Sequence, residues 1–368
     1  MGTEAEVLVI GGGPAGLASA IALRQQGMEV VVADGAKPPI DKACGEGLMP
    51  QTLQSLGELG VELPPALGKR IQGLRFVDGR TSVAANFPAK TGLGIRRTVL
   101  HQKLVERARE LGASFLWNTP VTGLCSGGAI VGGRKMKAAW IVGGDGIRSR
   151  VRRWAGLESG SHRMVRLAHQ QHYRARPWTD FVEIYWCKKM QLYVTPISDE
   201  EICLVLTSRE SGIRFEDALL ECPELAEKLK SAEQGGVHRG AITATYTLDR
   251  VSRENVALIG DASGGIDAIT GEGLNLCFRQ ALALASALKA GALESYTMAH
   301  RQLARRPLLL SRALLFLDRN PRLRKRIFRK FECDIALFGR LLGIQSAESS
   351  FSDIAEAAAR LCWQFLTV

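Results

Sequence analysis

The feature that most constrains the fold of this chain is a glycine-rich turn, Gly11-Gly12-Gly13-Pro14-Ala15-Gly16, placed between a predicted strand and a predicted helix. The apolar run Ala5–Ile10 precedes the turn, a helical pattern ending at Gly27 follows it, and the valine-rich run Glu29–Ala33 comes next. This order predicts one βαβ unit. Because such a crossover joins parallel strands, the sequence predicts a parallel sheet.

The spacing of the glycines predicts a dinucleotide site at this turn. Gly11 permits the tight turn, Gly13 lets the backbone approach a pyrophosphate, and Gly16 lets the helix pack close to the strand. Asp34 closes the second strand, near the spacing at which an acid binds a ribose hydroxyl. The N-terminus of the helix would then hold the anion. The alternative is a glycine-rich turn that holds no ligand.

The composition is that of a soluble globular protein, with 368 residues, 46% of them hydrophobic and 23% charged. A chain of this length amounts to roughly two domains, which excludes disorder, collagen and small secreted scaffolds. The apolar stretch Leu308–Leu317 contains Arg312 and is shorter than the about 20 residues that span a bilayer. The N-terminus has no signal-peptide pattern. The eight cysteines show no CxxC pair and no zinc spacing, so we predict reduced thiols, no metal site and a cytoplasmic location.

Basic residues are concentrated in residues 301–330, which hold eleven Lys/Arg and one acid, Asp318, and so carry +10 of the net charge of +11. No reader motif accompanies this charge, and we predict no nucleic-acid partner. On a helix, Leu323, Ile327 and Phe331 share one face. One interpretation is peripheral docking on an anionic membrane surface or on an acidic carrier. The other is a solvated helix whose apolar side packs on the rest of the protein.

Hydrophobic periodicity predicts further elements along the chain. Helices are predicted at Thr98–Leu111, Phe215–Lys230 and Gly273–Leu288, and the chain after Tyr296 has a helical pattern. The strand-rich region between about 163 and 207 predicts a second, antiparallel sheet. The predicted strands are Ser114–Trp117, Ala138–Val142, Phe181–Trp186, Gln191–Thr195, Ile202–Thr207, Ala241–Tyr246 and Val256–Ile259.

Two further stretches accompany the first turn. Gly143-Gly144-Asp145-Gly146 lies within Ile141–Arg152, and Gly260-Asp261 lies within Val256–Ser263, which leads on to Thr270–Asn275. In this order and at this separation, the three stretches resemble the single-component FAD-dependent oxidoreductases of the para-hydroxybenzoate hydroxylase fold. That superfamily includes aromatic hydroxylases, geranylgeranyl reductases and flavin-dependent halogenases. The resemblance covers about residues 5–290.

The resemblance implies an α/β fold in which a Rossmann-like FAD-binding domain carries an inserted antiparallel-sheet substrate domain and a helical C-terminal segment. The FAD-binding domain would comprise residues 1–70, 92–160 and 250–296. The substrate domain would comprise residues 71–91 and 161–249. Residues 297–368 would form the helical cap.

The resemblance also implies a set of cofactor-binding residues. Asp34 would bind the adenosine ribose, Asp145 would lie near the pyrophosphate, and Asp261 would lie near the ribityl chain. The turn before the helix at Gly273 would point its N-terminus at the isoalloxazine, and backbone N–H groups there would stabilise the reduced flavin. Arg97, which opens a predicted helix, would match the family arginine that approaches the cofactor. The alternatives are that Asp145 and Asp261 only form turns and that Arg97 is a solvated helix-start residue. The full set is Gly11, Gly13, Pro14, Ala15, Gly16, Asp34, Cys44, Gly45, Arg97, Asp145, Gly260, Asp261, Gly271, Gly273, Leu274 and Asn275.

Two segments bear on the reaction. Lys42–Pro50 resembles the Cys-Gly-x-Gly-Leu-x-Pro stretch of geranylgeranyl reductases and shares Gly-Glu-x-Leu-x-Pro with halogenase-like monooxygenases. In either branch it would run along the flavin and wall the substrate pocket. Tyr193–Pro196 occupies the place of the strand that closes the pocket. It lacks the tryptophans of the halogenases and the full aromatic signature of the reductases.

The candidate catalytic residues are Cys44, Glu46, Tyr193 and Glu272. Packing is the alternative for Cys44, and a helix-start carboxylate is the alternative for Glu272. His169 and His172 lie in a predicted strand and would face opposite sides of it, so at most one faces the pocket. Each is otherwise a hydrogen-bonded structural histidine.

The first prediction for the activity is an NADPH- or NADH-driven monooxygenase that hydroxylates an apolar aromatic or polyketide-like molecule through a C4a-hydroperoxyflavin. With no second glycine motif of this kind in the sequence, the nicotinamide would bind transiently. The alternative is a geranylgeranyl-reductase-like enzyme that reduces C=C bonds of an isoprenoid-like substrate. A third hypothesis is a non-catalytic flavin-binding scaffold or redox sensor.

Overall fold

A computed structural model describes residues 4–88, 90–160 and 164–345. Its first sheet has the strand order β17-β18-β11-β1-β2-β8, and β10 and β9 extend it from β11. The pairs of β1 with β2 and with β11, of β2 with β8, and of β11 with β18 are parallel. The bounds are β1 Glu4–Ile10, β2 Val30–Ala33, β8 Ser114–Leu116, β9 Val121–Cys125, β10 Gly128–Val131, β11 Arg134–Gly143, β17 Ser252–Arg253 and β18 Val256–Leu258.

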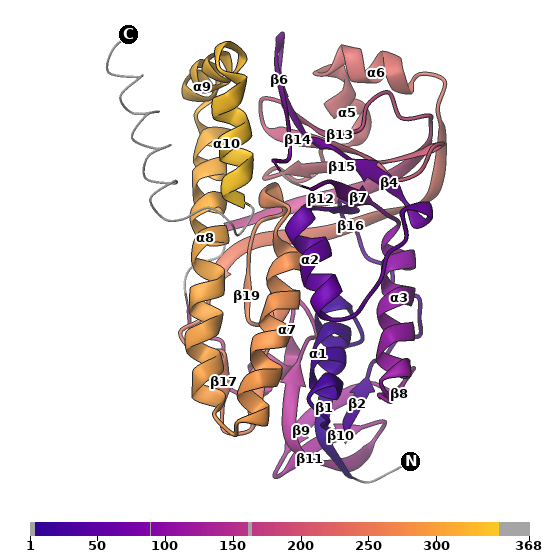
Figure 1. The fold of residues 1–368 in the computed structure, drawn as a ribbon, viewed down its shortest axis with the longest axis vertical. Coiled ribbons are helices and arrows are strands. Elements are labelled where there is room, and N and C mark those ends of the chain that lie inside the picture. The colour runs from indigo at the N-terminus through magenta and orange to yellow at the C-terminus, as the bar shows by residue number, and fades with distance from the viewer. Residues whose placement is uncertain (1–3, 89, 161–163, 346–368) are drawn as a thin grey trace.

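Helices cover this parallel sheet and bury its apolar strands. The helices α1 and α7 pack on one another, and α1 also packs on α3; the three run lengthwise through the lower part of the molecule (Figure 1). The N-terminal ends of α1 and α7 lie at the carboxyl ends of β1 and β18, where the glycine turns are. The helices are α1 Pro14–Gln25, α2 Pro50–Glu58, α3 Arg97–Glu110, α4 Arg150–Trp154 and α7 Gly273–Lys289.

A second eight-stranded sheet has the order β19-β16-β12-β15-β14-β13-β5-β6. All its pairs are antiparallel except β13 with β5, which brings residues 73–78 beside residues 181–186. A third, small sheet has the order β3-β7-β4. The bounds are β3 Gly47–Leu48, β4 Lys69–Ile71, β5 Gly73–Asp78, β6 Thr81–Asn86, β7 Gly92–Gly94, β12 Met164–Arg174, β13 Phe181–Trp186, β14 Met190–Pro196, β15 Glu201–Ser208, β16 Glu233–Thr247 and β19 Gly264–Gly265.

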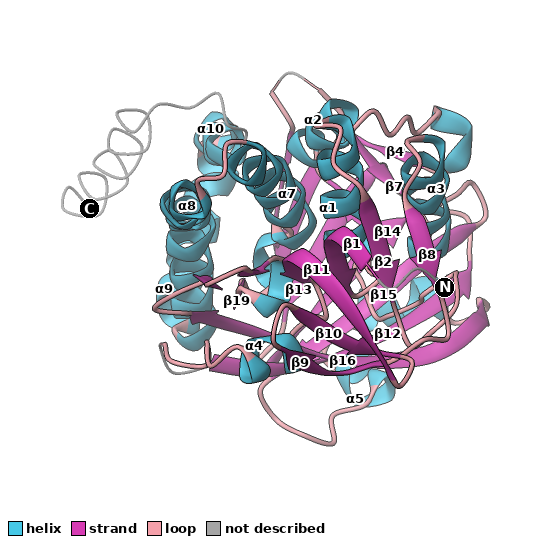
Figure 2. Ribbon diagram, turned by 90° about the horizontal axis from the view of Figure 1, so that it is seen from below, coloured by secondary structure: helices cyan, strands magenta, loops and turns pink. Residues whose placement is uncertain are grey.

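The two faces of the second sheet are covered by different helices. The outer face packs under α5 (Phe215–Leu220) and α6 (Pro223–Leu229). The inner face packs against α8 (Leu293–Arg319), α9 (Pro321–Cys333) and α10 (Ile335–Gln345). These three helices stand along one side of the molecule (Figures 1 and 2). The inner face also contacts the turn that precedes α7, through Ile269.

One predicted helix, Phe215–Lys230, is wrong in its continuity, because the structure divides it into α5 and α6. Pro223 begins the second helix and disfavours helical backbone at Cys222. Of the predicted cap, residues 346–368 lie outside the described residues. Among residues 4–88, 90–160 and 164–345, no helix combines the length and hydropathy needed to cross a membrane.

Candidate cofactor and active site

Three glycine turns, far apart in the sequence, pack against one another at the carboxyl ends of β1, β11 and β18. A Cβ atom at Gly16 would lie 1.8 Å from the carbonyl oxygen of Gly11, and one at Gly11 would lie 2.6 Å from the carbonyl oxygen of Gly144. Gly260, at φ +58°, places its Cα so close to Ala15 that a Cβ would lie 2.7 Å from the Ala15 Cβ. The structure therefore brings the three predicted turns together, and only glycine fits at these contacts.

Side chains from two other elements fix the first turn. The Gly12 N–H donates to Asp34 Oδ2 at 2.6 Å, and the Ala36 N–H donates to Asp34 Oδ1 at 2.7 Å. From α3, His101 Nε2 donates to the Gly12 carbonyl at 2.8 Å. Burial lowers the pKa of His101 below its usual 6.5. The imidazole that donates this hydrogen bond to the turn is therefore neutral at pH 7.

The turns leave space and unpaired polar atoms that suit a dinucleotide. A Cβ atom at Gly13, Gly146 or Gly273 would meet no heavy atom within 4 Å; Gly13 and Gly146 are half-buried, and Gly273 is exposed. Asp145 Oδ1 and Arg97 Nε are buried and have no hydrogen-bond partner in the structure. An ADP-containing cofactor needs free space beside the backbone N–H groups and polar side-chain atoms that it can bind. Both are present here, so these residues fit FAD.

The other two predicted aspartates, like Asp34, already have protein partners. Asp145 Oδ2 accepts from the N–H groups of Arg150 at 2.6 Å and Val151 at 3.1 Å, at the start of α4. Asp261 is half-exposed, and its carboxylate lies 3.5 Å from Lys42 Nζ. Asp145 thus keeps one buried oxygen without a partner, whereas the Asp261 carboxylate is half-exposed.

Glu272 belongs to a buried hydrogen-bonded turn before α7. Gln51 Nε2 donates to Glu272 Oε1 at 2.7 Å, and Asn275 Nδ2 donates to Oε2 at 3.0 Å. Burial raises the pKa of Glu272 above its usual range. Gly271, at φ +67°, sets the turn. Both oxygens of Glu272 have partners within the protein, so the carboxyl group shapes the turn.

A second buried group lies where β3 meets the inner face of the second sheet. We call it the Glu46 cluster, and it comprises Cys44, Glu46, Gln170, His172 and Cys203. Glu46 Oε2 lies 2.7 Å from His172 Nε2, and Glu46 Oε1 accepts from the Arg97 N–H at 2.8 Å. Gln170 Nε2 donates to the Cys44 carbonyl at 2.8 Å. Glu46 holds this position at φ +57°, a backbone conformation that is unusual for a non-glycine residue.

The Glu46 cluster offers three metal-type donors, because atoms of Glu46, His172 and Cys203 lie within 4.8 Å of one another. Burial raises the pKa of the Cys203 thiol well above its usual value. That shift disfavours the thiolate that a metal ligand requires. The Glu46–His172 hydrogen bond already joins the other two donors, so both have partners within the protein.

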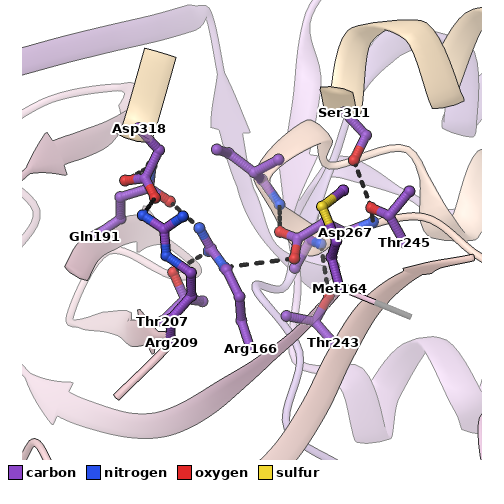
Figure 3. Close-up of polar contacts among 12 residues, drawn as sticks. Met164, Arg166, Gln191, Thr207, Arg209, Thr243, Thr245, Asp267, Ser311 and Asp318 are labelled. Carbon is purple, nitrogen blue, oxygen red and sulfur yellow. Dashed lines mark hydrogen bonds and ion pairs between the residues drawn. The ribbon is translucent and has the colours of Figure 1, made fainter. Parts of the chain in front are cut away.

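A third group, the Arg166 network, lies farther along the inner face (Figure 3). Arg166 Nη1 donates to Gln191 Oε1 at 2.9 Å, Arg166 also donates to Thr207, and its Nε lies 3.4 Å from Asp267 Oδ2. Gln191 Nε2 donates to Asp318 Oδ1 of α8 at 3.2 Å. The network therefore connects the sheet, the turn before α7 and the helical cap.

Tyr193 belongs to this network and not to the Glu46 cluster. Its hydroxyl donates to Gln191 Oε1 at 2.7 Å. Burial raises the pKa of Tyr193 to about 12, so the phenol stays protonated at neutral pH. The four candidate catalytic residues thus fall into three places: Cys44 and Glu46 together, Tyr193 with Arg166, and Glu272 in its own turn.

Several residues of these groups have no motif in the sequence. His172 faces Glu46, whereas His169 faces the other side of β12 and stacks on His238. Arg166 and Gln170 share the His172 side of that strand. The alternation of polar residues along an otherwise buried strand was the available signal. It does not reveal their partners, which lie before β3, on β14 and β15, and in the turn before α7.

The sequence profile of the FAD binding domain family matches residues 4–295. The menaquinone reductase of Mycolicibacterium smegmatis is 27% identical over 328 residues, which is 81% of this chain and 80% of that protein. The digeranylgeranylglycerophospholipid reductase 1 of Methanothermobacter thermautotrophicus is 26% identical over 298 residues, 74% of each. The ubiquinone hydroxylase UbiL of Rhodospirillum rubrum is 26% identical over 319 residues, 78% of this chain and 72% of that protein.

A solved structure of the flavin-dependent brominase Bmp2, as a triple mutant, superposes with a TM-score of 0.79 at 17% identity. The superposition covers 98% of this chain and 99% of the brominase. At this identity the likeness concerns the fold alone. It confirms the predicted fold class, in which an α/β nucleotide-binding unit carries an inserted sheet and a helical C-terminal segment.

Proposed function

The chain belongs to the FAD binding domain family and is an FAD-dependent oxidoreductase, and from this premise we propose that it reduces carbon–carbon double bonds of an isoprenoid-like substrate. Two of the relatives described above are named as reductases, and one of these names specifies a geranylgeranyl lipid. The Cys44–Pro50 segment favours the same branch, because it resembles the corresponding stretch of geranylgeranyl reductases.

We propose that FAD lies along the three packed turns. Asp34 would hold the adenosine ribose, Asp145 the pyrophosphate side and Asp261 the ribityl side. Arg97 would direct its orphaned Nε at the cofactor. When bound, FAD supplies two-electron redox chemistry, with NADPH or NADH proposed as the transient electron donor.

The Glu46–His172 pair is the observation that carries the proposed reaction. Reduction of a double bond adds two electrons and two protons, so the site needs a group that delivers a proton to carbon. Glu46 and His172 share a 2.7 Å contact and are buried. The Arg97 N–H orients the carboxyl group from its other side. The pair therefore holds a proton beside the arginine assigned to the cofactor, shielded from bulk water.

The inner face of the second sheet supplies apolar surroundings for a chain-like substrate. Ile184, Tyr193 and Val205 belong to one buried apolar cluster with Met49 and with Ile269 of the turn before α7. An isoprenoid chain gains free energy from such contacts through burial of apolar surface. The polar groups at the two ends of this face, the Glu46 cluster and the Arg166 network, would then orient the substrate.

The test is turnover of a prenylated quinone by the FAD-loaded enzyme with NADPH under anaerobic conditions. Because reduction of the quinone ring to a quinol also adds 2 Da, the product is reoxidised with ferricyanide before mass spectrometry. A product with a reduced side chain should remain 2 Da heavier than the substrate. We expect Glu46→Gln to lower kcat by about 10²–10⁴-fold, the range typical of general-acid catalysis. Its visible flavin spectrum should be retained. The control Glu110→Gln, at an exposed position on α3, should keep wild-type turnover. Full activity of Glu46→Gln would rule out this role.

Hydroxylation remains the second candidate, because one relative is named as a ubiquinone hydroxylase. The same assay separates the two reactions. A product 16 Da heavier that forms only when O2 is present supports a monooxygenase acting on an apolar aromatic or polyketide-like molecule. A yield of the reduced product that is the same without O2 as with O2 supports the reductase. The named relatives give no support to a non-catalytic scaffold.

A further inference from the structure

The helix α8 presents an exposed stripe that alternates cations and large apolar side chains. The stripe consists of Arg305, Leu309, Arg312, Phe316 and Arg319, which recur at spacings of four and three residues. Residues so spaced lie on one face of a helix. Leu309 is 52% exposed and Phe316 is 55% exposed, and the three arginines are exposed as well.

The opposite side of α8 is anchored in the protein. Ser311 and Thr245 share a 2.8 Å hydrogen bond, and Asp318 pairs with Arg209 at 2.7 Å. Leu315 packs in the apolar cluster of the inner face. Packing and polar contacts therefore fix the rotation of α8. The outward orientation of Leu309 and Phe316 follows from these contacts.

The helix α9 adds to the charge of this side of the molecule. Ile327, Phe328 and Phe331 are buried against the inner face, so the predicted packing of its apolar side is present. Arg324 is buried in an ion pair with Asp78 at 2.8 Å. The other cations of α9 are exposed, except for the half-buried Lys330. With Asp318 buried as well, residues 301–330 present cations to solvent without an exposed acid.

We propose that the α8 stripe docks on the surface of an anionic lipid bilayer. Phe316 and Leu309 would insert among the acyl chains near the headgroups, and the arginines would contact lipid phosphates while their stems remain in apolar surroundings. An acidic protein would match the charge, but two large apolar side chains set between arginines match a surface that is anionic and apolar together. The dense positive charge makes an anionic leaflet the complementary partner.

The reason for this docking rests on the proposed function, which requires a lipid-soluble substrate. An isoprenoid-like substrate resides in the bilayer, and α8 connects the stripe to the inner face, where Leu315 meets the apolar cluster. A docked α8 would place only this helix between the lipid and the apolar cluster and would shorten the path of the substrate through water. Vesicle binding can be measured without turnover, so failure of the proposed reaction and failure of docking are separate results.

The experiment is cosedimentation of the FAD-loaded protein with vesicles of phosphatidylcholine alone or with 30% phosphatidylglycerol. We expect binding to the anionic vesicles only, and weakening in 0.5 M NaCl because salt screens the charges. The variant Leu309→Asp/Arg312→Glu/Phe316→Asp should lower the partition coefficient about tenfold or more. The control Leu220→Asp/Lys135→Glu changes the net charge by −3, against −4 for the stripe variant. It alters exposed residues away from α8 and should bind as wild type does.

Circular dichroism and the flavin spectrum should match wild type in both variants, because the altered side chains are exposed. Equal binding of wild type to neutral and anionic vesicles would overturn the proposal. The proposal would also be overturned if the control variant lost as much vesicle binding as the stripe variant. Failure to bind vesicles, together with binding to immobilised polyglutamate, would assign the stripe to an acidic protein instead.

Discussion

At the scale of single residues, the glycines of the first turn divide into two kinds that the sequence motif treats alike. At Gly16 the Gly11 carbonyl occupies the space of a side chain, because an added Cβ would lie 1.8 Å from the Gly11 oxygen. At Gly13 an added Cβ would meet no heavy atom within 4 Å. The first is needed for packing of the helix on the strand. The second leaves room for a ligand.

This difference predicts opposite results for two alanine substitutions. Gly16→Ala should destabilise the FAD-free protein by several kcal/mol, on the order of an overpacked core site, and prevent FAD retention. Gly13→Ala should leave the unfolding midpoint of the FAD-free protein near wild type and weaken FAD binding by tenfold or more. Urea unfolding and fluorescence titration with FAD would measure the two effects. Equal unfolding midpoints for both variants would contradict the assignment.

The motif residues could be predicted from the sequence because their chemistry is local. Asp34 and the glycines lie within one βαβ unit, and turn geometry restricts the residue types that fit. His172 and Arg166 could not be assigned in this way. Their partners, Glu46 and Asp267, are more than 100 residues away in the sequence, and only the tertiary fold brings the segment before β3 and the turn after β19 to β12.

At the scale of elements, hydrophobic periodicity predicted whether a segment is a helix or a strand better than it predicted where the segment begins and ends. The strand Phe181–Trp186 was predicted with its observed bounds, and β16 is longer than the predicted Ala241–Tyr246. The small sheet of β3, β7 and β4 was not predicted, because its strands have two or three residues each and too few positions to show alternation.

The contact of α8 with the turn after β18 predicts a pH dependence of stability. His300 Nε2 lies 2.8 Å from Ser263 Oγ, and burial lowers the pKa of His300 from 6.5 to about 4. Between these values the unfolded chain holds more protons than the folded one, so stability falls as pH decreases from about 6.5 to 4. This residue alone should remove about 2 kcal/mol of the unfolding free energy between pH 7 and pH 5.

Replacement of the imidazole isolates this contribution. His300→Phe should show a smaller loss of unfolding free energy between pH 7 and pH 5 than wild type, by roughly the same 2 kcal/mol. The control Gln302→Ala, at an exposed position on the same helix, should keep the wild-type slope. Urea unfolding at pH 7, 6 and 5 provides the comparison. An unchanged slope in His300→Phe would show that other groups cause the dependence.

At the scale of the whole molecule, the proposed cofactor site is assembled from three chain segments, and unfolding disperses them. Ligand binding to the folded state alone therefore adds directly to stability. FAD at 100 times its Kd should raise the unfolding free energy by about 2.7 kcal/mol, and its removal should reverse the gain. Riboflavin, which lacks the pyrophosphate and adenosine, should give little stabilisation. Equal effects of the two ligands would place binding outside the glycine turns.

The parallel pairing of β5 with β13 has a consequence for synthesis on the ribosome. Residues 73–78 emerge early, yet their partner strand, residues 181–186, emerges about a hundred residues later, after roughly 5–20 s at usual elongation rates. During that interval the nascent hairpin of β5 and β6 carries an unsatisfied edge and apolar side chains that have no partner. A brief pause in synthesis before residue 186 should therefore lower the yield of native protein more than an equally long pause near the C-terminus. A shortage of chaperones should increase this loss.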